Sequence, residues 1–439
     1  LVAEGAPTAA VLIVDEAAQL PVHLLQALVR RHPRAHLAFA TTVHGYEGTG
    51  RGFALRFTPW LRGQEPAPME RTLNEAIRWS ADDDLERAIF STLLLDAEPA
   101  AGPFSESDPT RARMLTLDRD ALVADPERLR ALFGLLVQAH YRTTPGDLQR
   151  MLDAPNLEVH AAELDGEIVA VNLVAAEGEQ PPTTAVDAAA GRTRLRAHAL
   201  ADVLVAHLGH VEAGSLSMRR SVRIAVHPQL RRTGLARRLI AFVHERHPEI
   251  DLFGTLFAAT AEIIALRRRL GYEVVRVSAS RGARSGEPSV MMLRPQSPSA
   301  RALVAALRVE LGRELDTQLE LLRADEGISL APALEEALRR GLAPPPPLTA
   351  AEVLARVRTY VESPRTYESM ATALRTFVAQ ADLRALDEPA HAVVSGRVLA
   401  GRSWASVAAD AGLSQPAAMR ALRRAIRRLS AADETPPTT

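Results

Sequence analysis

The sequence predicts an α/β fold followed by an α+β fold, with a helical tail at the C-terminus. Residues 1 to about 105 alternate strand-like and helix-like runs, residues 111–295 place a hairpin before further strands and helices, and residues 296–439 have helical patterns only. A chain of 439 residues is also too long for one hydrophobic core. We therefore expect three domains: 1–105, 111–295 and 296–439.

The first region begins with a continuous apolar run. This run, within AAVLIVDEAA, ends at Asp15 and Glu16 and is typical of a buried parallel strand. PVHLLQALVRR then has helical spacing, and HLAFATTV predicts a second strand. That strand leads into a loop dense in glycine, with Gly45, Gly48, Gly50 and Gly52. Pro, Gly, Ser and acidic residues in 97–110 predict a linker.

The middle region has the order of an α+β domain with a mostly antiparallel sheet. PERLRALFGLLVQAHYR predicts a helix, and LEVHAAELDGEIVAVNLVAA predicts a hairpin that turns at Asp165-Gly166. The next predicted elements are SVRIAVHP (strand), GLARRLIAFVHER (helix), IDLFGTLFA (strand), AEIIALRRRL (helix), GYEVVRVS (strand) and SVMMLRP (strand).

The last region is helical apart from the proline run in APPPPLT, which predicts a stiff surface connection. RSWASVAADAGLSQPAAMRALRRAIRRL predicts a helix, a turn at Gly412 and a second helix. One face of the second helix is basic, with Arg420, Arg423, Arg424, Arg427 and Arg428. Another face is apolar, with Ala421, Leu422, Ala425, Ile426 and Leu429.

The composition excludes several classes of site. The chain has no cysteine, which excludes disulfides, thiolate zinc sites and cysteine nucleophiles. It has no lysine, so all 52 basic residues are arginine and no Gly-Lys-Ser/Thr phosphate loop is present. The net charge of −1 gives no global field for nucleic acid, and we expect no DNA partner. No apolar run reaches spanning length and no signal peptide is recognised, so we expect a cytoplasmic protein without membrane contact.

The most specific motif is VHPQLRRTGLARRLI. It places a strand, Arg223 to Val226, before a turn that leads into a helix. Such a turn presents backbone N–H groups at a helix N-terminus, where a pyrophosphate is favoured by the unpaired donors and by the helix dipole. Gly234 lets the backbone approach the phosphate, and Ala236 is small. The alternative is an ordinary strand–turn–helix with solvated arginines.

The middle region resembles a GNAT-type acetyltransferase, whose coenzyme A pyrophosphate is held in such a turn. AHYRTTPGDLQRMLDAP, VRIAVHPQLRRTG, RLGYEVVRVS and SGEPSVMML resemble one branch, the tRNA(Met) cytidine acetyltransferases. VDEAAQLP, ATTVHGYEGTGRGF and AIRWS resemble the RecA-like P-loop ATPase domain that precedes the acetyltransferase domain in that family, and GRSWASVAADAGL resembles its tail. The resemblance covers almost the whole chain.

The resemblance implies a set of site residues. The strand backbone at Ile224, Ala225 and Val226 would contact acetyl-CoA. The pyrophosphate would be held by Arg231, Arg232, Thr233, Gly234, Leu235, Ala236 and Arg237, with Glu262 and Arg269 completing the site. Arg78 would contact ATP, Asp15 would hold Mg²⁺ and Glu16 would polarise the attacking water. The sequence departs from the family at Arg231 (often Gln), at Leu266-Arg267 (an aromatic pair) and at Pro288 (often His).

Three of these assignments have simpler explanations. Glu262 follows Thr260 at the start of a helix, where the dipole stabilises any carboxylate. Two acids after a strand can be an ordinary strand end. The basic last helix can be a solvated amphipathic helix, although its arginines also suit an RNA backbone.

For the chemistry we expect acetyl transfer to the exocyclic amine of a cytidine. His140 is the candidate base, Tyr141 the candidate acid for the leaving thiolate, and backbone donors near Val226 would stabilise the oxyanion. His140 can equally cap or pack a helix end. The implied reaction is the ATP-dependent formation of N4-acetylcytidine at the wobble position of elongator tRNA(Met), with acetyl-CoA, ATP and Mg²⁺ as cofactors.

Two other functions are open at this point. The chain could be a GNAT enzyme that acetylates a protein or small-molecule amine, or a non-catalytic RNA-binding or scaffold protein with a degenerate ATPase domain. Because the chain starts at Leu1 without a phosphate loop, we expect that loop to precede Leu1. Thr41, Thr42 and the glycine-rich loop would then be the coupling part of the ATP site, or a flexible turn, and the chain would hydrolyse ATP poorly.

Overall fold

The fold is described from a computed structural model of the chain. The described residues are 9–42, 53–73, 75, 77, 79–80, 82–104, 106–139, 143–282, 286–327 and 329–433. They form two compact units, one of Leu1–Ala175, Ser221–His247 and Gly282–Gly286, the other of Ala176–Arg220, Pro248–Arg281 and Glu287–Thr439. Among the described residues, no helix combines the length and the apolar character needed to cross a bilayer.

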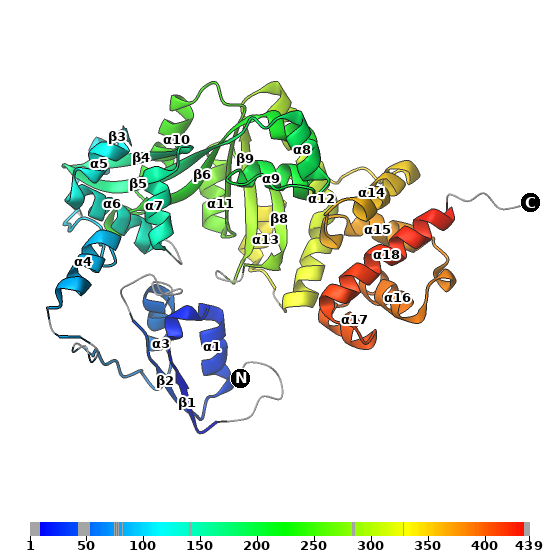
Figure 1. Ribbon diagram of the computed structural model, residues 1–439, viewed down its shortest axis with the longest axis horizontal. Helices are drawn as coiled ribbons and strands as arrows, with labels where there is room; N and C mark the ends of the chain where they lie inside the picture. The colour runs from blue at the N-terminus through cyan, green and yellow to red at the C-terminus, as the bar shows by residue number, and fades with distance from the viewer. Residues whose placement is uncertain are drawn as a thin grey trace, which may run out of the picture. The chain divides into compact units, whose positions relative to one another are not determined.

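The N-terminal elements are two parallel strands and short helices (Figure 1). Strand β1 (Val11–Val14) pairs in parallel with β2 (His36–Phe39), and α1 (Val22–Arg31) connects them. Leu25 of α1 and Phe57 are fully buried in their small core. The further helices here are η1 (Ala17–Gln19), η2 (Phe53–Phe57), α3 (Thr58–Arg62) and α4 (Asp84–Leu93). The two predicted strands and the helix between them are confirmed, but the prediction that the first strand is buried is wrong, because Val11 and Ile13 are 58% and 70% exposed.

A seven-stranded sheet forms the centre of the next part of the chain. Its strands are β3 (Arg113–Leu117), β4 (Leu157–Leu164), β5 (Glu167–Gly178), β6 (Ser217–Val226), β7 (Leu252–Ala258), β8 (Glu273–Arg281) and β9 (Pro288–Pro295). Their order is β3-β4-β5-β6-β7-β9-β8. The pairs β3/β4, β4/β5, β7/β9 and β8/β9 are antiparallel. The sequence predicts six of these strands and misses β3, which is short.

The hairpin of β4 and β5 turns where predicted. Asp165 and Gly166 have φ values of 52° and 88°, the left-handed pair that a two-residue hairpin turn needs. Both strands are almost continuously buried because helices cover both faces. One face packs on α6 (Pro126–Ala139) and α7 (Pro145–Asp153), and the other packs on α10 (Leu235–Arg246). Helix α5 (Arg119–Val123) and the short helices η3 (Pro109–Arg111) and η6 (Pro228–Leu230) lie in the same unit.

In the other unit, β7, β8 and β9 pack against α8 (Pro182–Ala189), α9 (Ala199–Asp202) and the long helix α12 (Pro298–Glu326). Close packing is visible at Gly254 of β7, where an added Cβ would lie 2.4 Å from the Leu200 side chain. The remaining elements here are η4 (Val203–His207), η5 (Val211–Ser215), α11 (Ala261–Arg268) and α13 (Pro332–Arg339).

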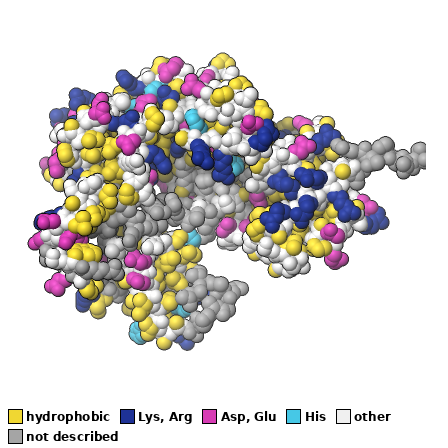
Figure 2. Space-filling view, viewed as in Figure 1, with side chains coloured by type: hydrophobic (Ala, Val, Ile, Leu, Met, Phe, Trp, Pro, Cys, Tyr) yellow, Lys and Arg dark blue, Asp and Glu magenta, His cyan; other side chains and the backbone are white. Residues whose placement is uncertain are grey.

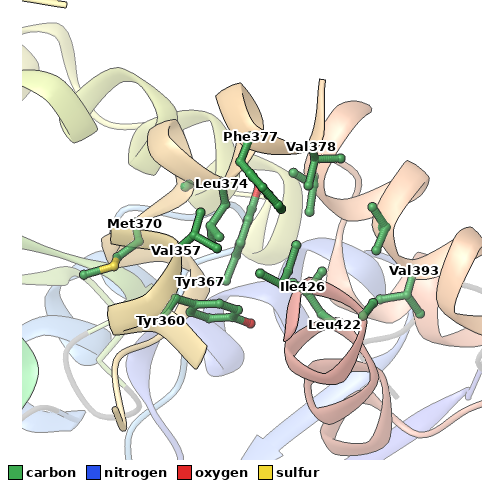
Figure 3. Packing of buried hydrophobic residues seen from close by; sticks show 14 of the residues in the cluster. Val357, Tyr360, Tyr367, Met370, Leu374, Phe377, Val378, Val393, Leu422 and Ile426 are labelled. Atoms are coloured by element: carbon green, nitrogen blue, oxygen red, sulfur yellow. The ribbon is translucent and has the colours of Figure 1, made fainter. Parts of the chain in front are cut away.

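The last helices form a bundle with its own core (Figures 1 and 3). They are α14 (Ala350–Glu362), η7 (Tyr367–Ser369), α15 (Ala371–Val378), η8 (Leu383–Ala385), α16 (Glu388–Val393), η9 (Val394–Leu399), α17 (Trp404–Asp410) and α18 (Gln415–Asp433). Leu321 of α12 also enters this core. The predicted helix–turn–helix is confirmed as α17 and α18, with Gly412 at φ 64° between them.

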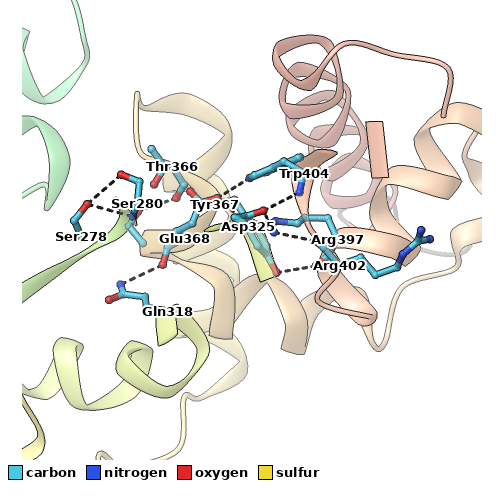
Figure 4. Close-up of polar contacts among 11 residues, drawn as sticks. Ser278, Ser280, Gln318, Asp325, Thr366, Tyr367, Glu368, Arg397, Arg402 and Trp404 are labelled. Atoms are coloured by element: carbon cyan, nitrogen blue, oxygen red, sulfur yellow. Dashed lines mark hydrogen bonds and ion pairs between the residues drawn. The ribbon is translucent and has the colours of Figure 1, made fainter. Parts of the chain in front are cut away.

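A buried arginine ties this bundle to α12 (Figure 4). The Arg397 side chain is fully buried, and its Nη1 and Nη2 donate to the two carboxylate oxygens of Asp325 at 3.0 and 2.7 Å. Nη2 also donates to Glu368 Oε1 at 3.0 Å, and the guanidinium lies 4.6 Å from the ring centre of Trp404. Asp325 is on α12, so the ion pair between Arg397 and Asp325 fixes the position of the bundle along that helix.

Candidate functional site

The turn between β6 and α10 has the backbone that its sequence predicts. Arg232 and Gly234 have positive φ values of 65° and 90°, and Gly234 is the N-cap of α10. A Cβ added at Gly234 would meet no described atom within 4 Å, so the space before the helix is open. The glycine is therefore required by the left-handed backbone, and the open space lets a ligand approach the main chain.

The N–H groups of this turn are available to a ligand. The first N–H groups of a helix have no partner inside it. For Arg232, Thr233 and Gly234, no backbone acceptor is found among the described residues. The helix dipole adds partial positive charge at the same point, so the turn favours an anion.

Three arginines surround the turn with their side chains exposed. Arg231, Arg232 and Arg237 make no ion pair with any carboxylate of the described residues. Arg238, next in sequence, has a different role, because its Nη1 and Nη2 each donate at 2.7 Å, to the carbonyls of Pro109 and Ala112. The turn thus combines exposed cations with one arginine that is held in place.

The turn is fixed from below by short polar contacts. Thr233 Oγ1 donates to the Leu230 carbonyl at 2.7 Å, and Leu230 N donates to the His227 carbonyl at 2.9 Å. His227 N in turn donates to the carbonyl of Val169 on β5 at 2.8 Å, which connects the turn to the sheet. Leu230 and Leu235 are buried beneath the turn. This support holds the N–H groups in one orientation before any ligand binds.

Part of the segment predicted as a linker packs against the turn. Phe104 is buried, its N–H donates to Gln229 Oε1 at 2.8 Å, and its ring lies 4.8 Å from the His227 ring. The carbonyls that hold Arg238 follow within a few residues. Sequence reasoning missed Phe104, Gln229 and Arg238 as supports, because their partners lie more than 100 residues away. The only local signal was a large aromatic residue in an otherwise polar stretch.

His227 contributes no charge to the turn near neutral pH. Its side chain is buried, and burial is the main cause that lowers its pKa below the usual range. The positive charge of Arg231 lowers this pKa further, while a backbone hydrogen bond at Ala100 raises it in part. The positive potential of the turn therefore comes from arginines and backbone dipoles.

The start of α7 is tied to β6 at Arg223, directly before the predicted cofactor residues of that strand. Arg223 Nη2 pairs with Asp147 Oδ1 at 2.8 Å, and Asp147 accepts from Thr144 N at 2.9 Å in a capping box. Burial raises the pKa of Asp147, but Arg223 and Thr144 outweigh it and the net shift is downward. Ile224, Ala225 and Val226 follow Arg223 on β6. The proposed catalytic residues His140 and Tyr141 lie outside the described residues.

Glu262 and Arg269 lie on α11 and at its C-cap, and both are exposed. They belong to the second compact unit, whereas the turn belongs to the first. Thr260 caps this helix by accepting from Ile263 N at 3.3 Å. Arg267, at the departure from the family's aromatic pair, is buried with its guanidinium 5.2 Å from the Tyr272 ring centre. A cation on an aromatic ring thus occupies this position.

The acidic pair follows β1 directly, as predicted. Asp15 is exposed, and its Oδ1 accepts from Glu16 N at 3.0 Å. Thr41, just after β2, accepts from Ala18 N through Oγ1 at 3.2 Å. The ends of both strands therefore meet at one place, the arrangement expected for nucleotide-sensing residues on a parallel sheet. Arg78 and the glycine-rich loop at 43–52 lie outside the described residues.

The basic face of α18 divides into two groups. Arg423 donates to the carbonyls of Tyr360, Ser363 (2.6 Å) and Arg365 (2.5 Å). Arg427 donates to the Val361 carbonyl at 3.2 Å. These contacts satisfy the C-terminal end of α14, so Arg423 and Arg427 both have a structural role, although Arg427 is also exposed. The assignment of these two arginines to RNA binding stays a prediction. Arg420, Arg424 and Arg428 are exposed, and Figure 2 shows basic side chains gathered over this helix.

The turn, its open N–H groups and the surrounding sheet define an acetyltransferase domain of the GNAT class. Residues 131–247 match the GNAT acetyltransferase 2 family, and residues 2–96 match the helicase domain of the RNA cytidine acetyltransferases NAT10/TcmA. Over almost its whole length the chain is similar to the tRNA(Met) cytidine acetyltransferases.

Relatives of that name match much of the chain. The protein of Nitrosococcus halophilus is 40% identical over 95% of this chain and 57% of its own length. The protein of Methanopyrus kandleri is 32% identical over 94% of this chain and 49% of its own length. The protein of Haloarcula marismortui is 41% identical over 68% of this chain and 38% of its own length. The chain thus spans about half the length of the curated relatives that it matches. A solved ribosomal-protein-S18-alanine N-acetyltransferase from Escherichia coli covers 42% of the chain at 14% identity and a TM-score of 0.29, too low to bear on substrate.

Proposed function

We propose that this chain transfers acetyl from acetyl-CoA to the N4 amine of the wobble cytidine of elongator tRNA(Met), with ATP hydrolysis assisting. One observation carries the proposal: an open, arginine-rich turn at a helix N-terminus lies in a chain 40% identical, over 95% of its length, to a tRNA(Met) cytidine acetyltransferase.

In this proposal the turn holds the pyrophosphate of acetyl-CoA. The N–H groups of residues 232–237 donate to phosphate oxygens, and Arg231, Arg232 and Arg237 neutralise their charge. Ile224, Ala225 and Val226 align the pantetheine arm along β6, and Glu262 and Arg269 complete the site. The supports beneath the turn keep these donors ordered, which lowers the entropy lost on binding.

The transfer needs a deprotonated amine as the new bond forms. The cytidine nitrogen attacks the thioester carbonyl, the C–N bond forms, the C–S bond breaks, and the amine proton passes to a base. We assign the base to His140 and protonation of the thiolate to Tyr141. Backbone N–H groups near Val226 would stabilise the oxyanion.

The ATP site is only partly supplied by the described residues. Asp15 is exposed at the end of β1 and could hold Mg²⁺, which would neutralise phosphate charge. Glu16 would orient the attacking water, Arg78 would contact the nucleotide, and Thr41 would sense its state. Because the chain has no lysine for a phosphate loop, we expect weak ATP hydrolysis by these 439 residues alone.

The exposed arginines of α18 are proposed to contact the RNA backbone. Replacing Arg420, Arg424 and Arg428 together with methionine should weaken tRNA binding and lower the slope of log affinity against log salt by about 0.7–0.9 for each phosphate that is no longer neutralised. Arg423→Met, judged by circular dichroism to retain its fold, should leave the slope unchanged. An unchanged slope in the triple variant would remove this surface from the proposal.

The reaction is tested by incubating the chain with tRNA(Met) and labelled acetyl-CoA, with and without ATP, and analysing the nucleosides. We expect labelled N4-acetylcytidine, and strong loss of it in Arg237→Met but not in the matched surface variant Arg384→Met. Label in a polyamine or protein but not in RNA would favour an amine acetyltransferase. Coenzyme A binding without any transfer would favour a non-catalytic scaffold.

A further inference from the structure

Two histidines and a glutamate meet on the sheet far from the proposed acetyl-CoA turn. Glu158 and His160 are on β4, and His247 is the C-cap of α10. Glu158 Oε2 lies 3.3 Å from His160 Nε2 and 3.1 Å from His247 Nε2. The ligand atoms of the three residues all lie within 4.8 Å of one another. This cluster is the only one of its kind found among the described residues.

One nitrogen in the cluster lacks a hydrogen-bond partner. His160 is fully buried, and its Nε2 has no hydrogen bond among the described residues even though Glu158 is near. Its Nδ1 is 3.0 Å from Thr116 Oγ1. With the proton on Nδ1 and donated to Thr116, Nε2 turns a lone pair toward Glu158 and His247. A buried nitrogen without a hydrogen bond destabilises the fold, and a bound cation would offset that cost.

The spacing fits a small transition-metal ion. In a tetrahedral zinc site with bonds of about 2.0–2.2 Å, neighbouring ligand atoms lie about 3.3–3.6 Å apart. Glu158 Oε2 lies 3.3 Å from His160 Nε2, at the lower end of this range, and 3.1 Å from His247 Nε2, slightly below it. Two imidazoles with one carboxylate suit Zn²⁺ and disfavour Mg²⁺ and Ca²⁺, which prefer oxygen ligands. The side chains of Glu158 and His247 are 33% and 13% exposed, so solvent can reach the remaining position.

We propose that Glu158, His160 and His247 form a binding site for a zinc-class divalent cation, with Thr116 as the positioning residue of His160. The ion would join β4 to the C-terminal end of α10. That helix has 12 residues and is therefore about 18 Å long, so the ion would lie far from the pyrophosphate turn at its other end. Its role would be to fix α10 and not to act on the acetyl group. The proposal does not depend on the proposed acetyl transfer.

The test measures metal directly. The full chain is stripped with a chelator, dialysed, and titrated with Zn²⁺ against a chromophoric chelator, and bound metal is counted by elemental analysis. We expect one Zn²⁺ per chain and a rise in melting temperature, with no such rise for Mg²⁺. His247→Ala, at the C-cap of α10, should abolish the stoichiometric site, whereas His391→Ala, which changes an exposed histidine on α16, should leave it intact.

Two results would overturn the site. They are zinc binding below one equivalent in the wild-type chain, and equal zinc binding by wild type and a folded His247→Ala variant. Glu158→Gln, which retains shape, provides a second test if His247→Ala does not fold. Thr116→Val should weaken zinc affinity by about 10-fold to 100-fold, and Thr116→Ser should restore it.

Discussion

The start of α10 and the helix α18 each carry a pair of adjacent arginines. In the first pair the second arginine is bonded to the fold, and in the other pair the first arginine is. At the turn, Arg237 faces open space and its neighbour Arg238 is held by two backbone carbonyls. On α18, Arg424 is exposed and its neighbour Arg423 is held by three. In each pair one arginine stabilises the fold and the other remains available to an anion. The carbonyls within reach decide which is which.

Arg397 has a purely structural role, and its replacement should cause the largest loss of stability. Arg397→Leu leaves Asp325 and Glu368 without their cation, so we expect the free energy of unfolding to fall by about 3–5 kcal/mol. Urea denaturation of the full chain would measure it. The 91% exposed Arg384, replaced in the same way, should change stability by at most about 0.5 kcal/mol. Equal effects would show that the network of Figure 4 adds nothing to the fold.

The pair Arg237 and Arg238, at the turn before α10, should separate the effect on coenzyme A affinity from the effect on stability. Arg237→Met removes an exposed cation that makes no ion pair with the described residues, so coenzyme A should bind about 10-fold more weakly with little change in the free energy of unfolding. Arg238→Met frees two carbonyls and should lower the free energy of unfolding by about 1.5–3 kcal/mol. Calorimetric titration and urea denaturation of both variants would check this. If Arg237→Met bound coenzyme A like wild type, the turn would lose its proposed role.

For Arg423 and Arg424 on α18 we expect a smaller difference, and in stability alone. Arg423→Met removes the donor to three carbonyls and the guanidinium that lies 4.4 Å from the Tyr360 ring centre, which should cost about 1–3 kcal/mol. Arg424→Met should be neutral within about 0.5 kcal/mol. Thermal melting of the two variants side by side measures the difference. Equal melting temperatures would return Arg423 to the candidates for RNA contact.

The smallest expected effect is a pH dependence at His210. Burial lowers the pKa of His210, but Glu310 and Glu212 outweigh it and leave the pKa raised. Their atoms lie 3.8 and 3.1 Å from the ring nitrogens, and Arg356 pairs with Glu310 from the other side. Because the folded pKa exceeds the unfolded value of about 6.5, this contribution is complete below that pH and is lost as pH rises through the folded pKa.

The measurement is the urea midpoint between about pH 6 and about pH 9. His210→Gln should make that midpoint less dependent on pH in this range, whereas His391→Gln, at an exposed position, should not. A wild-type stability that does not fall above neutral pH would contradict the raised pKa.

Much of the fold and part of the site could be predicted from local patterns. The hairpin at Asp165-Gly166 and the amphipathic helix α18 follow from turn chemistry and hydrophobic spacing, and the structure confirms both. The turn at Gly234 was predictable because a helix N-terminus needs only neighbouring residues to define it. The catalytic assignments to His140 and Tyr141 stay predictions.

Other features depended on partners distant in sequence. The segment around Phe104 has the composition of a linker, yet its aromatic ring packs against His227, more than 100 residues later. Arg423 and Arg424 are indistinguishable by pattern, since the carbonyls that hold Arg423 come from the end of α14. The Glu158–His160–His247 cluster likewise forms only when α10 lies across β4.

The sequence by itself determined most of the order of elements, the hairpin, the turn before α10 and the resemblance to a family, because these depend on local propensity, spacing and similarity of sequence. Only the tertiary structure decided which arginines are structural, what supports the turn and which histidines meet. The physical reason is that hydrogen bonds and burial depend on the distance between atoms and not on their separation in sequence.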